Sequence, residues 1–227
     1  MSTYLWINIG AIIVPLIFSF DKKVAFYSRW KYFLPAMLSV AFIFVIWDIY
    51  FTRIGIWGFN PLHLSGIKIV NLPIEEVLFF IAIPYASVFT YDVLNAYIKI
   101  DLIGKKSNFI SAFLAFFLLI TGIIFHENTY TSVSFITTGA LILLLQFLLR
   151  FRCMGRFYLT YVIVLFPFLV VNGLLTGSWI QQEVVWYNNQ ENLGIRLFTI
   201  PVEDFVYGME LILLNVFIYE KLKPASG

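Results

Sequence analysis

The sequence predicts an all-α integral membrane protein with seven transmembrane helices, arranged as two parallel three-helix repeats joined by a connector helix. Of the 227 residues, 61% are hydrophobic and 12% are charged, whereas a soluble domain is about half apolar and roughly a quarter charged. A helix needs roughly 20 apolar residues to cross a bilayer. Seven stretches of about that length are apolar: Tyr4–Phe20, Phe33–Tyr50, Pro73–Tyr97, Asn108–Phe125, Thr131–Leu149, Phe157–Thr176 and Pro201–Tyr219.

The distribution of basic residues predicts how the helices are oriented. Seven spans place successive loops on alternate faces, and of the 15 Lys and Arg residues only Arg53, Lys68 and Arg196 fall on one of them. Loops rich in Lys and Arg stay in the cytoplasm. We therefore expect the N-terminus to lie outside and the C-terminus in the cytoplasm. Acidic residues gather on the outer side, and because they influence topology little, their position indicates a function.

The prediction of two three-helix units rests on an internal repeat in the sequence. The segment Leu72–Phe79 matches Ile200–Tyr207 residue by residue in kind at a shift of 128, and Asn60 falls on Asn188 at the same shift. Residues 1–97 are therefore expected to form the first three-helix repeat, 98–130 the connector helix, and 131–227 the second repeat. A single connector helix keeps both repeats in the same orientation, so they are related by an axis along the membrane normal.

Each repeat carries a pair of acids directly after a proline, and these pairs have a structural and a functional interpretation. Proline and acids suit the first turn of any helix, so the pairs could simply begin two helices. Ionisable groups in a membrane segment are costly, however, and are functional by default. Two copies in aromatic surroundings favour the functional interpretation. The candidate catalytic residues are Glu75, Glu76, Glu203 and Asp204.

The chemistry expected of these acids follows from their crowding. Several carboxylates in a poorly hydrated cavity cannot all ionise, so one should hold a proton beside ionised partners. Such a set can deliver a proton to an apolar substrate and later remove one from a cation. The spacing i, i+4, i+7 puts Glu203, Tyr207 and Glu210 on one helix face, so Glu210 should continue the acidic stripe deeper into the membrane.

Aromatic and polar residues close to these acids in sequence complete the candidate site. Aromatic faces stabilise cations, although Trp and Tyr also form interfacial belts. The amides of Asn60 and Asn188 could orient the acids or cap loop turns. The candidate substrate-binding residues are Trp47, Asp48, Trp57, Asn60, Phe79, Trp186, Asn188, Tyr207 and Glu210. Asp92, near the cytoplasmic end of the third span, is expected to be solvated or to extend to the interface.

The sequence lacks motifs for metal, nucleotide or serine-hydrolase chemistry. His63 and His126 have no metal-ligand partner at helical spacing, and Cys153 is the single cysteine, so no metal site is expected. The chain has no phosphate-binding loop, dinucleotide fingerprint or Gly-x-Ser-x-Gly motif. We therefore expect no cofactor and no nucleic-acid partner.

These residues resemble the lycopene cyclase domain family, in its small integral-membrane form with two fused repeats. The resemblance is carried by Trp47-Asp48, Trp57–Asn60, Pro73–Phe80 and Pro201–Asp204, and it covers essentially the whole chain. It implies a lycopene β-cyclase, an intramolecular lyase or isomerase of carotenoid biosynthesis. In that redox-neutral reaction an acid protonates the terminal double bond of a ψ end group. The neighbouring double bond attacks the resulting cation, and loss of a ring proton leaves a β-ionone ring, so that lycopene becomes β-carotene.

The resemblance also sets the expected partners and leaves several points open. It implies an integral protein of the bacterial cytoplasmic (inner) membrane, a lipophilic carotenoid substrate in the lipid bilayer, and other carotenoid-pathway enzymes as partners. Thr176 stands where the second repeat should match Asp48, and no Trp matches Trp47, so the two halves are not equivalent. The motif does not fix the ring type (β, ε or γ) or the carotenoid length.

Three other classes of membrane protein are alternatives to a cyclase. Duplicated helices with carboxylates at matching positions also suit a proton-coupled membrane transporter of a small or lipophilic substrate. A membrane prenyltransferase would need diphosphate and magnesium sites with widely spaced aspartates, which the sequence lacks. A non-catalytic scaffold would leave the paired acids unexplained.

Overall fold

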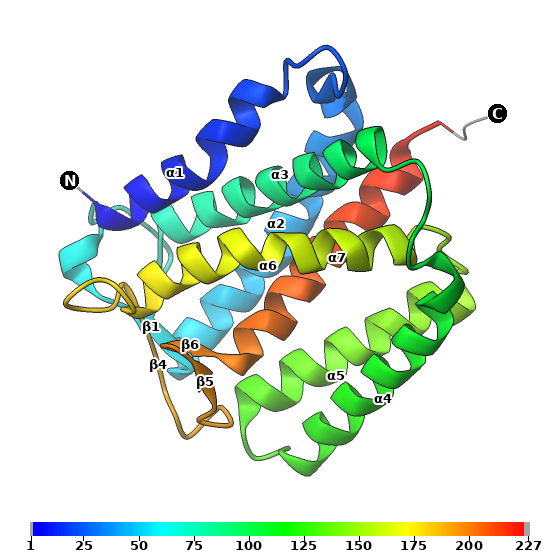
Figure 1. Cartoon of the computed structure of the whole chain (residues 1–227). Helices are drawn as coiled ribbons and strands as arrows, with labels where there is room; N and C mark the ends of the chain where they lie inside the picture. Colours follow the sequence, from blue (N-terminus) through cyan, green and yellow to red (C-terminus); the bar gives the residue numbers. More distant parts are fainter. Residues whose placement is uncertain (1, 225–227) are drawn as a thin grey trace.

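The computed structural model describes residues 2–224, and this part of the chain is built mainly from helices (Figure 1). Its α-helices are α1 (Thr3–Phe18), α2 (Trp30–Ile54), α3 (Ile74–Tyr97), α4 (Ser107–Ile124), α5 (Thr129–Leu143), α6 (Met154–Thr176) and α7 (Val202–Leu222). A π-helical turn, η4 (Leu144–Leu148), continues α5. Short 3-10 helices lie between these elements: η1 (Phe26–Arg29), η2 (Pro61–His63) and η3 (Gly104–Lys106). The prediction of an all-α fold with seven helices is confirmed for the described residues.

Five helical stretches are long and apolar enough to cross a membrane: Phe26–Ile54, Ile74–Tyr97, Gly104–Ile124, Thr129–Leu148 and Met154–Thr176. Helix α1 is shorter, with 16 residues, and α7 carries Glu203, Asp204 and Glu210 within its first nine residues. The apolar helices are consistent with an integral membrane protein. The layout with seven spans stays a prediction.

The outward faces of the helices are apolar, as expected of surfaces in contact with lipid. On α4, Phe109 is 75% exposed and Phe113 66% exposed, and contiguous apolar surface of this kind is rare on a soluble monomer. The inner side of α4 approaches α5 closely at glycines. A Cβ atom at Gly122 would lie 2.8 Å from Ile136, and one at Gly139 would lie 2.9 Å from Leu119. Small residues at such contacts are typical of membrane helix pairs.

One end of the bundle carries short strands, and we call it the strand end. Strand β1 (Trp57–Phe59), which follows α2, pairs antiparallel with β4 (Val185–Tyr187), which follows α6. In this pairing Gly58 lies opposite Trp186, and Trp57 lies opposite Tyr187. A shift of 128 residues also carries Gly58 onto Trp186, so the two segments exchange roles about a local two-fold axis.

Two hairpins at the strand end repeat one another in the same way. Strands β2 (Lys68–Ile69) and β3 (Leu72–Pro73) form the hairpin before α3, and β5 (Arg196–Leu197) and β6 (Ile200–Pro201) form the one before α7. Each pair of partner residues in the first hairpin reappears in the second at a shift of 128. These matched registers support a duplicated unit, while its boundaries in the chain stay a prediction.

The expectation for Asp92 is wrong. Its side chain is only 1% exposed, and it accepts a hydrogen bond of 2.7 Å from Arg29 Nη1 and another from the Tyr219 hydroxyl. Helix α7 and η1 pack over this end of α3, so the carboxylate is covered instead of solvated. A buried charge is tolerated when it is paired and hydrogen-bonded.

The bundle and the distribution of basic residues together predict the topology. Reporter fusions after Lys23, Lys105 and Arg152 should all report a cytoplasmic location, because these loops lie at the end opposite the strands and are rich in Lys and Arg. A fusion in the strand-end loop after Asn189 should report the outside. A periplasmic signal from any of the first three fusions would contradict the seven-span layout.

Candidate functional site

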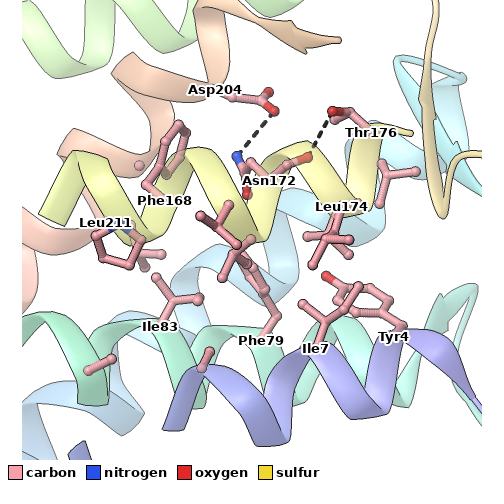
Figure 2. A pocket seen from close by; sticks show the side chains of 18 of the residues that line it. Tyr4, Ile7, Phe79, Ile83, Phe168, Asn172, Leu174, Thr176, Asp204 and Leu211 are labelled. Atoms are coloured by element: carbon pink, nitrogen blue, oxygen red, sulfur yellow. Dashed lines mark hydrogen bonds between the residues drawn. The ribbon is translucent and has the colours of Figure 1, made fainter. Parts of the chain in front are cut away.

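A cavity of about 830 Å³ lies between α6 on one side and α1 and α3 on the other (Figure 2). Helices α2 and α7 and strands β1 and β4 also contribute to its wall. Along α3 the lining residues run from Glu76 to Thr90, a distance of about 21 Å at 1.5 Å per residue. The cavity is therefore long, and most of its wall is apolar.

Three carboxyl groups gather at the strand end of this cavity. Asp48 comes from the last turns of α2, Glu76 from the first turn of α3, and Asp204 from the first turn of α7. All three are at most 7% exposed. Pro73 and Pro201 cap the two acidic helices from extended backbone, so the second acid of each motif falls in the first turn.

Asp204 is surrounded by hydrogen-bond donors. The hydroxyl of Tyr130 donates to its Oδ1 at 2.7 Å, and the hydroxyl of Tyr187 donates to its Oδ2 at 2.9 Å. The amide of Asn172 on α6 also donates to Oδ2, at 3.4 Å (Figure 2). Burial and the nearby Asp204 raise the pKa of Tyr187 well above its ordinary value, which keeps this phenol a donor. An ionised carboxylate accepts hydrogen bonds only, so these donors match a negatively charged Asp204.

Glu76 and Asp48 have a different environment. The hydroxyl of Tyr4 donates to Glu76 Oε2 at 2.6 Å, and the hydroxyl of Tyr207 donates to Asp48 Oδ1 at 2.8 Å. The two carboxyl groups line the same end of the cavity and are both buried. Buried like charges in one poorly hydrated pocket cannot readily both ionise. The pair is therefore suited to hold a proton.

Trp57 lies among these acid-binding tyrosines. Its side chain is 5% exposed and lines the cavity. Its ring centroid is 5.0 Å from that of Tyr130, 5.9 Å from Tyr207 and 6.2 Å from Tyr187. Trp47 packs behind Tyr207 at 5.4 Å and does not line the cavity. The strand end of the cavity is thus walled by aromatic rings that could stabilise a cation.

The first acid of each motif points elsewhere. Glu75 Oε1 accepts a hydrogen bond from the Ser65 amide at 2.6 Å, and Glu203 Oε1 accepts one from the Leu193 amide at 2.8 Å. Thr131 also donates to Glu203, at 2.6 Å. Both acids are fully buried but neither lines the cavity. Successive helix residues point about 100° apart, so each motif sends its first acid to the loop ten residues earlier and its second acid into the cavity.

The acidic stripe on α7 does not face the cavity, contrary to the expectation that Glu210 extends the site. Glu210 accepts hydrogen bonds from Thr137 and Thr138 on α5, at 2.8 and 2.9 Å, and Glu203 also faces α5. Tyr207, by contrast, lines the cavity and binds Asp48. The reason is that α5 packs along the face of α7 that carries both glutamates.

The remaining candidates divide between the cavity and the surface. Phe79 lines the cavity, whereas Trp186 is 43% exposed and lies outside its wall. Asn60 accepts from the Leu62 amide at 3.1 Å, and Asn188 accepts from the Gln190 amide at 3.1 Å. These two asparagines therefore cap turns, one of the two roles expected of them.

Three residues that contact the acids of this site were not predicted from the sequence: Tyr4, Tyr130 and Asn172. Tyr4 begins α1 and Tyr130 begins α5, and each binds the second acid of the motif in its own half. Their spacing of 126 residues instead of 128 hid this match. Among residues 2–224, no three His, Cys, Asp or Glu side chains are arranged to hold a metal ion.

Similarity to known proteins gives further evidence about this site. The family model described as lycopene cyclase matches residues 1–94 and 127–222. A bifunctional lycopene cyclase/phytoene synthase from Aspergillus niger is 38% identical over 56 residues, which cover 24% of this chain and 10% of that protein. No solved structure matches. The family model covers most of the chain, including both acidic motifs and the tyrosines that bind their second acids, and the chain therefore belongs to the lycopene cyclase family.

Proposed function

We propose that this protein converts the ψ end groups of lycopene into β-ionone rings, and so forms β-carotene within the membrane. The observation that carries the proposal is a long apolar cavity that ends in three carboxyl groups held by tyrosines. An intramolecular cyclisation of this kind is redox-neutral, and it needs an acid and a base at one end of an apolar chain.

The shape of the cavity suits a linear polyene. Its strand end holds the acids and Trp57, and its other end is mainly aliphatic, with Ile83 on α3 and Leu211 and Ile212 on α7. Lycopene has no polar group, so burial of apolar surface is the main source of its binding energy. An end group placed among the aromatic rings would leave the rest of the chain along the aliphatic wall.

The first step assigns the proton donor to the Glu76–Asp48 pair. The proton held by the pair moves to the terminal double bond, whose π electrons form the new C–H bond and leave a tertiary cation. The π electrons of the neighbouring double bond then form the ring C–C bond, which moves the positive charge onto a ring carbon. Aromatic faces such as that of Trp57 would stabilise both cations.

The second step assigns the base to Asp204. Its Tyr130, Tyr187 and Asn172 partners stabilise a carboxylate, and this carboxylate would take the ring proton while the C–H electrons form the ring double bond. One proton enters the substrate and one leaves, so the product is an isomer of the substrate. Return of the proton from Asp204 to the Glu76–Asp48 pair restores the starting state.

The first prediction separates the two acids of each motif. Glu76→Gln and Asp204→Asn should each lower cyclisation by about 10²–10⁴-fold, because each removes a general acid or base. Glu75→Gln and Glu203→Gln should do less harm, because these acids do not line the cavity. Pigment analysis of a lycopene-accumulating bacterium, normalised to membrane-inserted protein, gives the measurement. Parental activity in both Glu76→Gln and Asp204→Asn would exclude the mechanism.

A second prediction concerns the cation. Trp57→Phe keeps an aromatic face and should retain most activity, whereas Trp57→Leu should lose it by about two- to thirty-fold. This range corresponds to the roughly 0.5–2 kcal/mol of a cation–π contact. Initial rates in reconstituted vesicles provide the comparison. Equal rates for the two variants at equal protein levels would show that the aromatic face does not act on the cation.

A third prediction follows from the proton balance. In deuterated water without added flavin or nicotinamide, the purified protein in lipid should incorporate one deuterium for each ring formed. The deuterium comes from the exchangeable carboxyl groups and is added to a carbon of the terminal double bond. This carbon loses no proton in the later step, so the deuterium stays in the product. Mass spectrometry of the product measures it. An unlabelled ring, or an absolute need for either cofactor, would refute acid–base cyclisation. A proton-coupled transporter, the alternative drawn from the sequence, would leave lycopene unchanged.

A further inference from the structure

We infer that the carotenoid enters the cavity sideways from the lipid, through a mouth between α1 and α6; this inference rests on the proposed cyclase function. The observation behind it is that some residues line the cavity and are also exposed on the outside of the bundle. Val14 on α1 is 55% exposed, and Val170 on α6 is 53% exposed. Gly10 and Pro167 are lining residues on the same two helices and are also exposed.

The mouth is open beside Gly10. A Cβ atom built on this exposed, cavity-lining residue would meet no atom within 4 Å apart from those of its own helix backbone and chain neighbours. Figure 2 shows the cavity between these same elements, with α6 on one side and α1 and α3 on the other. The lining side chains that reach the outside are apolar, so the mouth is compatible with acyl chains and not with water.

On α1 the mouth extends away from the acids, whereas on α6 Val170 is two residues from Asn172, which binds Asp204. Val14 is ten residues from Tyr4 on α1, which corresponds to about 15 Å along the axis. Tyr4 binds Glu76 at the strand end, where residues of the paired strands β1 and β4 line the cavity. An end group would therefore enter first and travel toward the acids, while the rest of the polyene follows through the mouth.

A single mouth and a single set of acids have a consequence for the product. Glu76 and Asp204 belong to different halves of the chain but line one cavity, so one entry can cyclise one end of the substrate. The second end must enter after the first has left. Obstruction of the mouth should therefore lower the total amount of cyclic product and raise the proportion that has one ring.

The test compares tryptophan substitutions at the mouth with matched substitutions outside it. Val14→Trp and Val170→Trp should lose most of the cyclisation activity, and the remaining product should be enriched in the one-ring carotenoid. Ile13→Trp and Val162→Trp are the controls. These positions are 44% and 56% exposed on the same two helices but do not line the cavity, so both controls should retain parental activity and product ratio.

A block applied after folding removes the risk that a mouth variant fails to fold. In a Cys153→Ser background, Val14→Cys should lose activity when a bulky, membrane-permeant maleimide is added to the folded protein. Ile13→Cys should be labelled to the same extent and keep its activity. Full activity of the labelled Val14→Cys protein would overturn the entry route.

A binding measurement separates failure of the route from failure of the proposed function. Glu76→Gln should retain lycopene when it is purified from lycopene-containing membranes, detected by the visible absorbance of the pigment. Adding Val14→Trp should abolish this retention, and adding Ile13→Trp should not. If Glu76→Gln and the parental protein both retain no lycopene, the carotenoid function itself fails, and the entry route fails with it. If lycopene is retained equally in all variants, only the route is overturned.

Discussion

The pairing of β1 with β4 is the interaction on which the site depends. It ties the end of α2 to the end of α6, with backbone bonds of 2.8 Å from Asn60 to Val184 and 2.9 Å from Asn188 to Ile56. A Cβ atom at Gly58 would lie 2.3 Å from the Trp186 ring, so this close approach favours glycine. Because the strands exchange roles about a local axis, the helices that follow them are held in matching positions. This arrangement brings acids from separate halves of the chain into one cavity.

The two halves of the chain have matching backbones but provide different chemical environments for their acids. Asp48 on α2 lies beside the same end of the cavity as Glu76, but Thr176, at the matching position of α6, bonds to Asn172 and Thr199. The first half therefore contributes two carboxyl groups to the cavity, and the second contributes one carboxyl group with several donors. A symmetric site would hold two identical groups. The proposed cyclisation needs an acid and a base at once, and the divergence at this one position would provide that difference.

The sequence predicts the helices and the acidic motifs well, because long apolar runs and a repeated Pro-x-Glu-acid signal are local features. It cannot predict which acid of each motif faces the cavity, since that depends on how each helix is rotated against its neighbours. The burial of Asp92 and the contact of Glu210 with α5 arise from packing between distant segments in the same way. Tyr4 and Tyr130 were missed because their partners lie 72 and 74 residues away and their own spacing departs from the repeat.

The proposed cyclisation needs a site that excludes water from the acids and admits the substrate from the lipid. Bulk water beside a carbocation would react with it. Water beside the carboxyl groups would compete with the alkene for their protons. Exclusion of water prevents such side reactions. Asp48, Glu76 and Asp204 are at most 7% exposed, and Trp57 and the paired strands line the cavity beside them. Lycopene, the proposed substrate, dissolves in the bilayer and not in water, so its entrance has no reason to be on the aqueous side. A lateral mouth in the apolar part of the helices would admit the polyene without hydrating the acids.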